Sequence, residues 1–240
     1  MKAKPSILLL QARLATDPMT QHELECFVSQ SGVSTDQITV RNLVEAPLET
    51  KECLSHDVVF VGGSGSFYVS KQDLPYFGAY QDAIGELIVG GHPLLGICYG
   101  YQTIASALGA TIEHLPQKTE VGSYDVRLTS AGSQDELLGQ LPSEFTVQQG
   151  HKDHVTLLPR QLDNLAKSER CENQAFRVGK LPIWGVQFHP ELTKAGNKTR
   201  FTHYIEGYGS AFTPAQTQEI MDRFAESPHA SSLLSRFLEL

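Results

Sequence analysis

Residues 92–102, His-Pro-Leu-Leu-Gly-Ile-Cys-Tyr-Gly-Tyr-Gln, hold the pattern that decides the fold of this 240-residue chain. The apolar first half predicts the end of a short buried strand, and residues 103–108 begin a helix. Cys98 stands between the two, with Gly96 and Gly100 two residues away on either side. This layout, Gly-x-nucleophile-x-Gly between a strand and a helix, indicates a nucleophile elbow.

The elbow needs these residue types for physical reasons. A tight strand-to-helix turn holds the backbone of the nucleophile in a strained conformation, so the residues around it must lack bulk. The turn also places the sulfur of Cys98 at a helix N-terminus, which favours a thiolate. The alternative is that Cys98 is simply a small buried apolar residue, as free cysteines often are.

Upstream of the elbow, short apolar runs alternate with helical patterns. The runs predict strands at 6–11, 37–43 and 57–61, and the patterns predict helices at 21–29, 48–56 and 82–89. Strands that alternate with helices are typical of a doubly wound α/β fold with a mostly parallel sheet flanked by helices.

Downstream, we expect strands at 111–115, 121–129 and 145–148, and a hairpin formed by 171–178 and 181–188. From residue 197 the apolar spacing is helical, which predicts a C-terminal helical extension. We therefore expect one domain over 1–196 with an extension, 197–240, packed on it. The last apolar stretch, 233–238, is an alternative surface for self-association, so a homo-oligomer is possible.

A glycine-rich segment, Gly-Gly-Ser-Gly-Ser at 62–66, follows the third predicted strand. Such a turn at the carboxyl end of a parallel strand presents backbone N–H groups to the crevice there. It lacks the Lys-Ser/Thr of a phosphate-binding P-loop and the third glycine of a dinucleotide fingerprint. Two interpretations remain: an oxyanion-binding N–H for the nucleophile, or a plain flexible loop.

Two further segments carry polar side chains beside apolar runs. The segment 149–154, Gln-Gly-His-Lys-Asp-His, is either a solvated loop or a wall of the pocket. Its two histidines lack a third ligand nearby, which argues against a metal site. Gly-Val-Gln-Phe-His-Pro-Glu at 185–191 ends an apolar strand in His189. Glu191 suits a carboxylate that orients this imidazole as a general base. By itself, a residue such as His189 is more often an ordinary core or surface histidine, and the functional interpretation depends on its partner.

Composition narrows the class of protein. The net charge is −8 and no basic run is longer than a pair, so we expect no nucleic-acid or membrane partner. The four cysteines are far apart and form no Cys-x-x-Cys pair, which argues against zinc and disulfides and for a reducing compartment. No apolar stretch reaches the length of a signal peptide core or a membrane span, so we expect a cytoplasmic protein.

Taken together, three segments make the chain resemble the class I, triad-type glutamine amidotransferases. The specific segments are residues 96–102, 62–63 and 185–191. The nearest resemblance is to the glutaminase domain of GMP synthase, whose His-x-Asp loop matches 151–153, and the gamma-glutamyl peptidases share the same skeleton. The resemblance implies a flavodoxin-like α/β domain.

The resemblance also implies a chemistry. Cys98 would attack the side-chain carbonyl of glutamine, release ammonia and form a γ-glutamyl thioester. His189 would transfer the protons, and Glu191 would orient His189.

The resemblance implies the binding residues as well. The N–H groups of Gly63 and Tyr99 would form the oxyanion hole. The substrate-binding residues would be Gly62, Gln102, Gly150 and His151. The chain departs from the family at Ser64, where a proline is frequent, and at Gly150, where a serine is frequent. No metal and no organic cofactor is expected.

Three functions are consistent with these patterns. The first is a glutaminase that acts alone or supplies ammonia to a synthase on another polypeptide. The second is a gamma-glutamyl peptidase that cleaves a γ-glutamyl amide. The third is a non-catalytic binding module that retains the fold, against which the complete Cys-His-Glu set argues.

Overall fold

The computed structural model describes residues 4–208 and 212–240 and contains eleven strands and eight α-helices. The strands are β1 (Ile7–Ala12), β2 (Ile38–Asn42), β3 (Val58–Ser64), β4 (Leu94–Ile97), β5 (Thr111–His114), β6 (Glu120–Leu128), β7 (Glu144–His151), β8 (Asp153–Leu157), β9 (Leu162–Lys167), β10 (Ala175–Val178) and β11 (Ile183–Val186). The helices are α1 (Met19–Ser31), α2 (Thr50–Leu54), α3 (Phe77–Gly90), α4 (Tyr99–Ala107), α5 (Lys194–Tyr208), α6 (Pro214–Arg223), α7 (Pro228–Ser231) and α8 (Leu233–Phe237).

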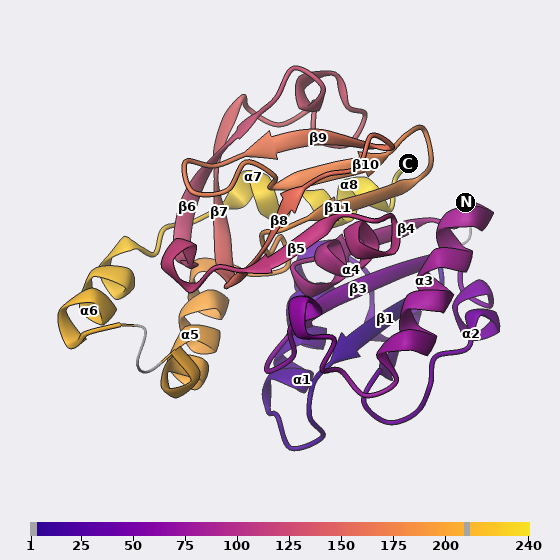
Figure 1. The fold of residues 1–240 in the computed structure, drawn as a ribbon, viewed down its shortest axis with the longest axis horizontal. Helices are drawn as coiled ribbons and strands as arrows, with labels where there is room; N and C mark the ends of the chain where they lie inside the picture. Colours follow the sequence, from indigo (N-terminus) through magenta and orange to yellow (C-terminus); the bar gives the residue numbers. More distant parts are fainter. Residues whose placement is uncertain (1–3, 209–211) are drawn as a thin grey trace.

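Nine strands form one sheet in the order β2-β1-β3-β4-β11-β10-β9-β6-β7, and β5 pairs with β8 in a small second sheet (Figure 1). The strands from β2 to β11 are parallel, and the pairs from β11 to β7 are antiparallel. The predicted doubly wound α/β fold is confirmed, and its antiparallel half makes the complete sheet mixed. Because β1, β3, β4 and β11 are parallel neighbours, their carboxyl ends meet at one edge.

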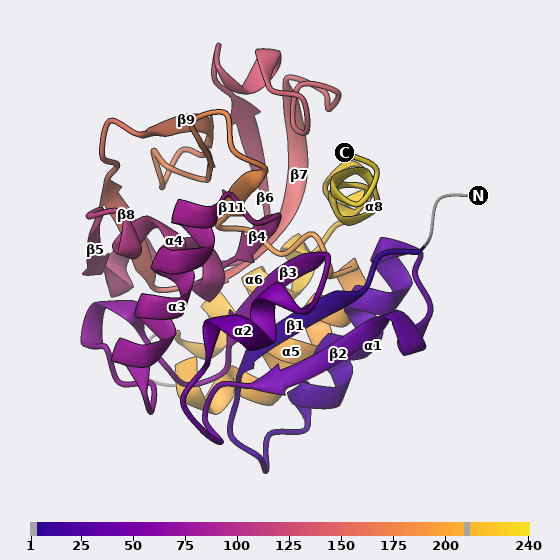
Figure 2. The same cartoon turned by 90° about the vertical axis from the view of Figure 1, so that its right-hand side faces the viewer.

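Both faces of the parallel half are covered, as the continuous apolar runs predict. Alternate residues of β1 point to opposite faces, so Leu8 and Leu10 pack in one core and Ile7 and Leu9 in the other. Figure 2 shows α2, α3 and α4 on one side of the sheet and α1 and α8 on the other. The elbow between β4 and α4 is therefore held by packing on both faces.

The C-terminal helices pack on the sheet through two different clusters. Helix α5 runs through position 196, and α5 and α6 pack on β6 through a separate cluster that contains Phe201 and Ile220 (Figure 1). In α8, Leu234 and Phe237 are buried against the sheet and Trp184. The self-association role considered for 233–238 is therefore wrong for this face, because the face is used within the chain.

No helix within 4–208 and 212–240 combines the length and the hydropathy that crossing a bilayer requires.

Candidate active site

The predicted elbow is present at the carboxyl end of β4. Cys98 has φ 53° and ψ −98° and lies directly between Ile97, the last residue of β4, and α4. Its N–H donates a hydrogen bond of 2.9 Å to the carbonyl oxygen of Val186 on the neighbouring β11. A positive φ is strained for any residue with a side chain, so the sheet and helix together hold the cysteine in this conformation.

The two flanking glycines allow this turn because nothing larger fits. A β-carbon at Gly96 would lie 2.6 Å from the carbonyl group of Gly100. A β-carbon at Gly100 would lie 2.6 Å from Cβ of Val61 on β3. The spacing read from the sequence therefore reflects a close contact between α4 and two strands.

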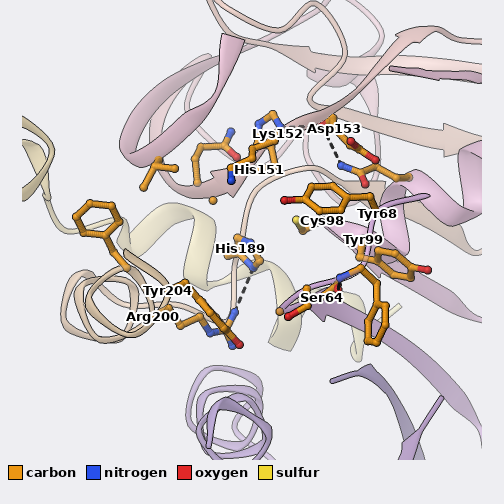
Figure 3. A pocket seen from close by; sticks show the side chains of 18 of the residues that line it. Ser64, Tyr68, Cys98, Tyr99, His151, Lys152, Asp153, His189, Arg200 and Tyr204 are labelled. Atoms are coloured by element: carbon orange, nitrogen blue, oxygen red, sulfur yellow. Dashed lines mark hydrogen bonds between the residues drawn. The ribbon is translucent and has the colours of Figure 1, made fainter. Parts of the chain in front are cut away.

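A cavity of about 320 Å³ opens beside the elbow. Cys98 and His189 both line it, although each side chain is almost completely buried. Figure 3 shows the two side chains close to one another in the cavity, with Tyr68 on one side and Arg200 and Tyr204 on the other. His189 follows β11 and Cys98 follows β4, so parallel pairing of these two strands brings together residues 91 positions apart in the sequence.

His189 and Glu191 form a buried pair behind the thiol. Nδ1 of His189 lies 2.8 Å from Oε1 of Glu191. Burial by itself would lower the pKa of His189, but Glu191 and Cys98 outweigh it and raise the pKa to about 9. Burial would likewise raise the pKa of Glu191, but His189 and Arg200 lower it to about 2. This corner therefore favours an imidazolium next to a carboxylate.

Three charged residues in this corner were not predicted from the sequence. Arg200 on α5 donates from Nη1 to Oε1 of Glu191 at 2.7 Å. Glu23 on α1 accepts two hydrogen bonds from Arg13, at 3.0 and 3.1 Å, and all three side chains are buried. Arg13 had a usable signal, since it is a polar residue directly after a buried parallel strand. Arg200 and Glu23 are ordinary helix residues in the sequence and carry no such signal.

The glycine pair at 62–63 lies differently from the prediction. Both glycines belong to β3 rather than to a flexible loop, and neither lines the cavity; Ser64 begins that wall. The N–H of Gly63 donates to Oε1 of Glu23 at 3.2 Å. A β-carbon at Gly63 would lie 3.0 Å from Cε1 of His189, so the residue is adjacent to the site while its donor points to α1.

Tyr99, Gln102, Gly150 and His151 all line the cavity. Tyr99 is the first residue of α4, where a helix leaves N–H groups without intrahelical partners. The Nε2 group of Gln102 donates to the carbonyl oxygen of Asp153 and to Oε1 of Gln187, both at 3.0 Å.

The solvated-loop interpretation of 149–154 is wrong. These residues lie at the end of β7 and the start of β8, and Gln149, His151, Asp153 and His154 are buried. Strand pairing satisfies the backbone hydrogen bonds of these residues and places them as a wall of the cavity. This is the other interpretation that the sequence left open.

Within the described ranges 4–208 and 212–240, no cluster of three histidine, cysteine or acidic side chains could hold a metal ion. The four cysteines are free thiols.

Known proteins resemble this chain over most of its length. The family model described as "Glutamine amidotransferase class-I" matches residues 22–205. GMP synthase [glutamine-hydrolyzing] of Porphyromonas gingivalis is 32% identical over 177 residues, which is 70% of this chain and 33% of that protein. One subunit of the GMP synthase [glutamine-hydrolyzing] of Methanopyrus kandleri is 33% identical over 119 residues, which is 50% of this chain and 58% of that polypeptide. The chain thus spans a third of one relative and less than two thirds of the other.

Among solved structures, a glutamine amidotransferase from Thermotoga maritima superposes with a TM-score of 0.70 at 25% identity. The alignment covers 97% of this chain and 96% of that one.

Proposed function

Because the chain belongs to the class I glutamine amidotransferase family, we propose that it hydrolyses the side-chain amide of glutamine to glutamate and ammonia through a thioester on Cys98. The observation that carries this proposal is the convergence of Cys98 and His189 on one cavity, with Glu191 bonded to the far nitrogen of the imidazole. A cysteine, a histidine next to it and a carboxylate behind the histidine are the parts that thiol-based acyl transfer needs.

The reaction would proceed in two halves. The Cys98 thiolate attacks the amide carbon, and the tetrahedral intermediate collapses as the C–N bond breaks and His189 gives its proton to the leaving ammonia. The neutral imidazole then takes a proton from water, whose oxygen attacks the thioester carbon. The C–S bond breaks, glutamate leaves, and the thiolate–imidazolium pair is restored.

The proposed binding contacts follow from the cavity wall. The N–H of Tyr99 at the start of α4 would bind the oxyanion. Gly63 can serve as a second donor only after its N–H leaves Glu23, and Gly62 would contribute by allowing that movement. Gln102, whose Nε2 is bonded within the protein, would offer its carbonyl oxygen to the substrate, and the backbone of Gly150 and His151 would form the opposite wall.

The ammonia is proposed to pass to a synthase on another polypeptide. Support comes from the Methanopyrus kandleri relative, whose name describes one subunit of a glutamine-hydrolysing GMP synthase. The free thiols also support a reducing, cytoplasmic location.

The test is glutamate release from free glutamine, measured with and without candidate synthases. We expect Cys98→Ala to reduce turnover by at least about 10⁴-fold, because Cys98 is the one cysteine among the described residues that line the cavity. Cys53→Ala is the matched control, since Cys53 is also a buried thiol but lies on α2 in the core. Full activity in Cys98→Ala would end the assignment. No glutamate release by folded wild-type protein, combined with an unreactive Cys98 toward a glutamine-like electrophile, would favour a non-catalytic module.

A second candidate substrate is a γ-glutamyl amide with a larger amine. The cavity extends past the thiol to aromatic side chains, with Tyr68 on one side and Tyr204 of α5 on the other. Phe201 of α5 also lines the cavity. The primary amide of glutamine does not need this surface, whereas an apolar amine would pack against it. Amine release from a panel of γ-glutamyl compounds would decide, and an inert panel alongside glutamine turnover would reject this candidate.

A further inference from the structure

One oxygen atom of Glu191 is shared by two cationic partners. Oε1 lies 2.8 Å from Nδ1 of His189 and 2.7 Å from Nη1 of Arg200. The same Nη1 lies 3.4 Å from Nδ1 of His189, so the guanidinium and the imidazole are direct neighbours. In Figure 3 the Arg200 and Cys98 side chains lie on different sides of His189. Arg200 therefore contacts the base from the side away from the reacting sulfur.

Arg200 is the arginine that lies next to Glu191, whereas Arg13 is paired with other carboxylates. Glu23 is the other buried carboxylate here, and it already accepts hydrogen bonds from Nε and Nη2 of Arg13. Nη2 of Arg200 is 3.7 Å from Glu23, a longer and weaker contact than its bond to Glu191. Arg13 also pairs with Asp17 at 3.5 Å, so Arg200 is the arginine that compensates Glu191. A buried carboxylate without such a partner strongly stabilises any proton nearby.

Other titratable groups face the same corner. They are Arg13 after β1, Asp17 before α1, three residues of α1 (His22, Glu23 and Cys26), Cys98 after β4 and Tyr204 on α5. Burial and Arg200 lower the pKa of His22, and burial raises the pKa of Cys26 to about 11. Both groups are therefore neutral near pH 7, and neither replaces the charge of Arg200.

We propose that Arg200 is a positioning residue that compensates Glu191 whenever His189 is unprotonated, and so allows the imidazole to act as a base toward the thioester. The proposal rests on the hydrolytic function proposed above. Arg200 matters most in the thioester intermediate. In that state ammonia has taken the proton of His189, and the sulfur of Cys98 no longer carries a charge. At that moment Glu191 would be a buried, uncompensated carboxylate without Arg200.

The consequence is a specific defect. Without the guanidinium, Glu191 and the loss of a neighbouring positive charge both favour the imidazolium, so the base would be neutral only at higher pH. Hydrolysis of the thioester would slow more than its formation, because formation uses the imidazolium and hydrolysis uses the neutral imidazole.

The experiment compares wild type, Arg200→Met and Arg200→Lys in glutamine hydrolysis across pH. For Arg200→Met we expect kcat to fall at least tenfold at pH 7 with a parallel fall in KM, γ-glutamyl-enzyme to accumulate in mass spectra, and the rising limb of the kcat profile to move up by about one pH unit. Arg200→Lys keeps a positive charge, so the rising limb of its kcat profile should lie close to that of wild type. Arg177→Met is the matched control, because Arg177 on β10 forms a partly buried ion pair with Glu136, outside the cavity.

A second readout does not depend on turnover. Iodoacetamide converts the Cys98 thiol to a neutral thioether, and NMR of the His189 ring nitrogens then follows its titration in the alkylated protein. We expect the titration midpoint of Arg200→Met to lie about one pH unit above that of wild type. An unmoved midpoint, or an equal shift in Arg177→Met, would overturn the role of Arg200. If wild type hydrolyses neither glutamine nor any γ-glutamyl compound, the proposed function fails while this titration still decides the inference. Arg200→Gln serves if Arg200→Met does not fold.

Discussion

Two histidines that line the same cavity each pair with a buried glutamate, and we propose a catalytic role for only one of them, His189. His189 and Glu191 are two residues apart in the turn after β11, with a separation of 2.8 Å. His151 and Glu120 face each other across β7 and β6, with a separation of 2.9 Å. The two separations are nearly equal, but His189 uses Nδ1 and His151 uses Nε2, and the surroundings of the two pairs differ.

The difference lies in the second ring nitrogen. Nδ1 of His151 is bonded to the carbonyl oxygen of Asp153 at 3.0 Å, so both nitrogens of this ring are bonded within the protein. His189 uses Nδ1 for Glu191, and its ring also interacts with Cys98.

The partner of His151 is also more firmly bonded. Burial would raise the pKa of Glu120, but hydrogen bonds from His151, Ser168 and Gln174 outweigh it and lower the pKa. We therefore propose that the His151 pair, whose bonds are all satisfied, is structural, and that the His189 pair, which leaves one nitrogen for a nucleophile, is reactive.

The largest expected effect tests the reactive histidine. His189→Asn should reduce kcat for glutamine hydrolysis by about 10³-fold, because the proton donor and acceptor are lost. His151→Asn is the matched variant and should change kcat by less than about tenfold. Steady-state kinetics at pH 7 measure both, and equal losses in the two variants would remove the distinction between the pairs.

The next effect compares the two carboxylates by the same substitution. Glu191→Gln should reduce kcat by about 10²-fold, because the amide no longer supports the imidazolium. Glu120→Gln should leave kcat within about threefold of wild type and lower the unfolding free energy by about 3 kcal/mol, because it breaks a buried hydrogen-bonded pair. Kinetics and urea unfolding of both proteins give the answer. A large kcat loss in Glu120→Gln would show that the His151 pair also takes part in the reaction.

The smallest effect is a pH dependence of stability. The pKa of His189 is raised to about 9 in the folded protein and is near 6.5 in the unfolded chain. The contribution of His189 to the free energy of unfolding is therefore complete below pH 6.5 and is lost as pH rises through about 9. The unfolding free energy of wild type should therefore fall between pH 6.5 and 9, by on the order of 2 kcal/mol more than that of His189→Asn. Chemical unfolding at several pH values measures this difference. Parallel curves for the two proteins would contradict the raised pKa.

Sequence patterns predicted the parts of the site that are local in the chain. The Gly-x-Cys-x-Gly spacing reflects contacts within one turn, and His189 and Glu191 are near neighbours in sequence, so both could be recognised. The alternation of apolar runs and helices predicted the parallel half of the sheet. In the antiparallel half, β6, β7 and β10 were predicted as strands, whereas β9 was not, and the order of these strands in the sheet had no local signal.

The missed features are long-range. Glu23 and Arg200 lie on α1 and α5, and nothing next to them in sequence distinguishes them from surface charges. The polar segment at 149–154 was ambiguous for the same reason, since only pairing with neighbouring strands shows that it is buried. The apolar face of α8 predicted burial correctly, while the surface that covers it had to come from the fold.

By itself, the sequence determined which backbone turns are possible and which side chains are chemically able to react, because spacing, glycine and side-chain type act over a few residues. Only the tertiary structure decided which charges meet. Compensation of a buried carboxylate depends on atoms within a few ångströms in space, and those atoms belong to elements far apart in the chain. The Glu191–Arg200 bond and the turn of the Gly63 N–H toward Glu23 are therefore properties of the fold.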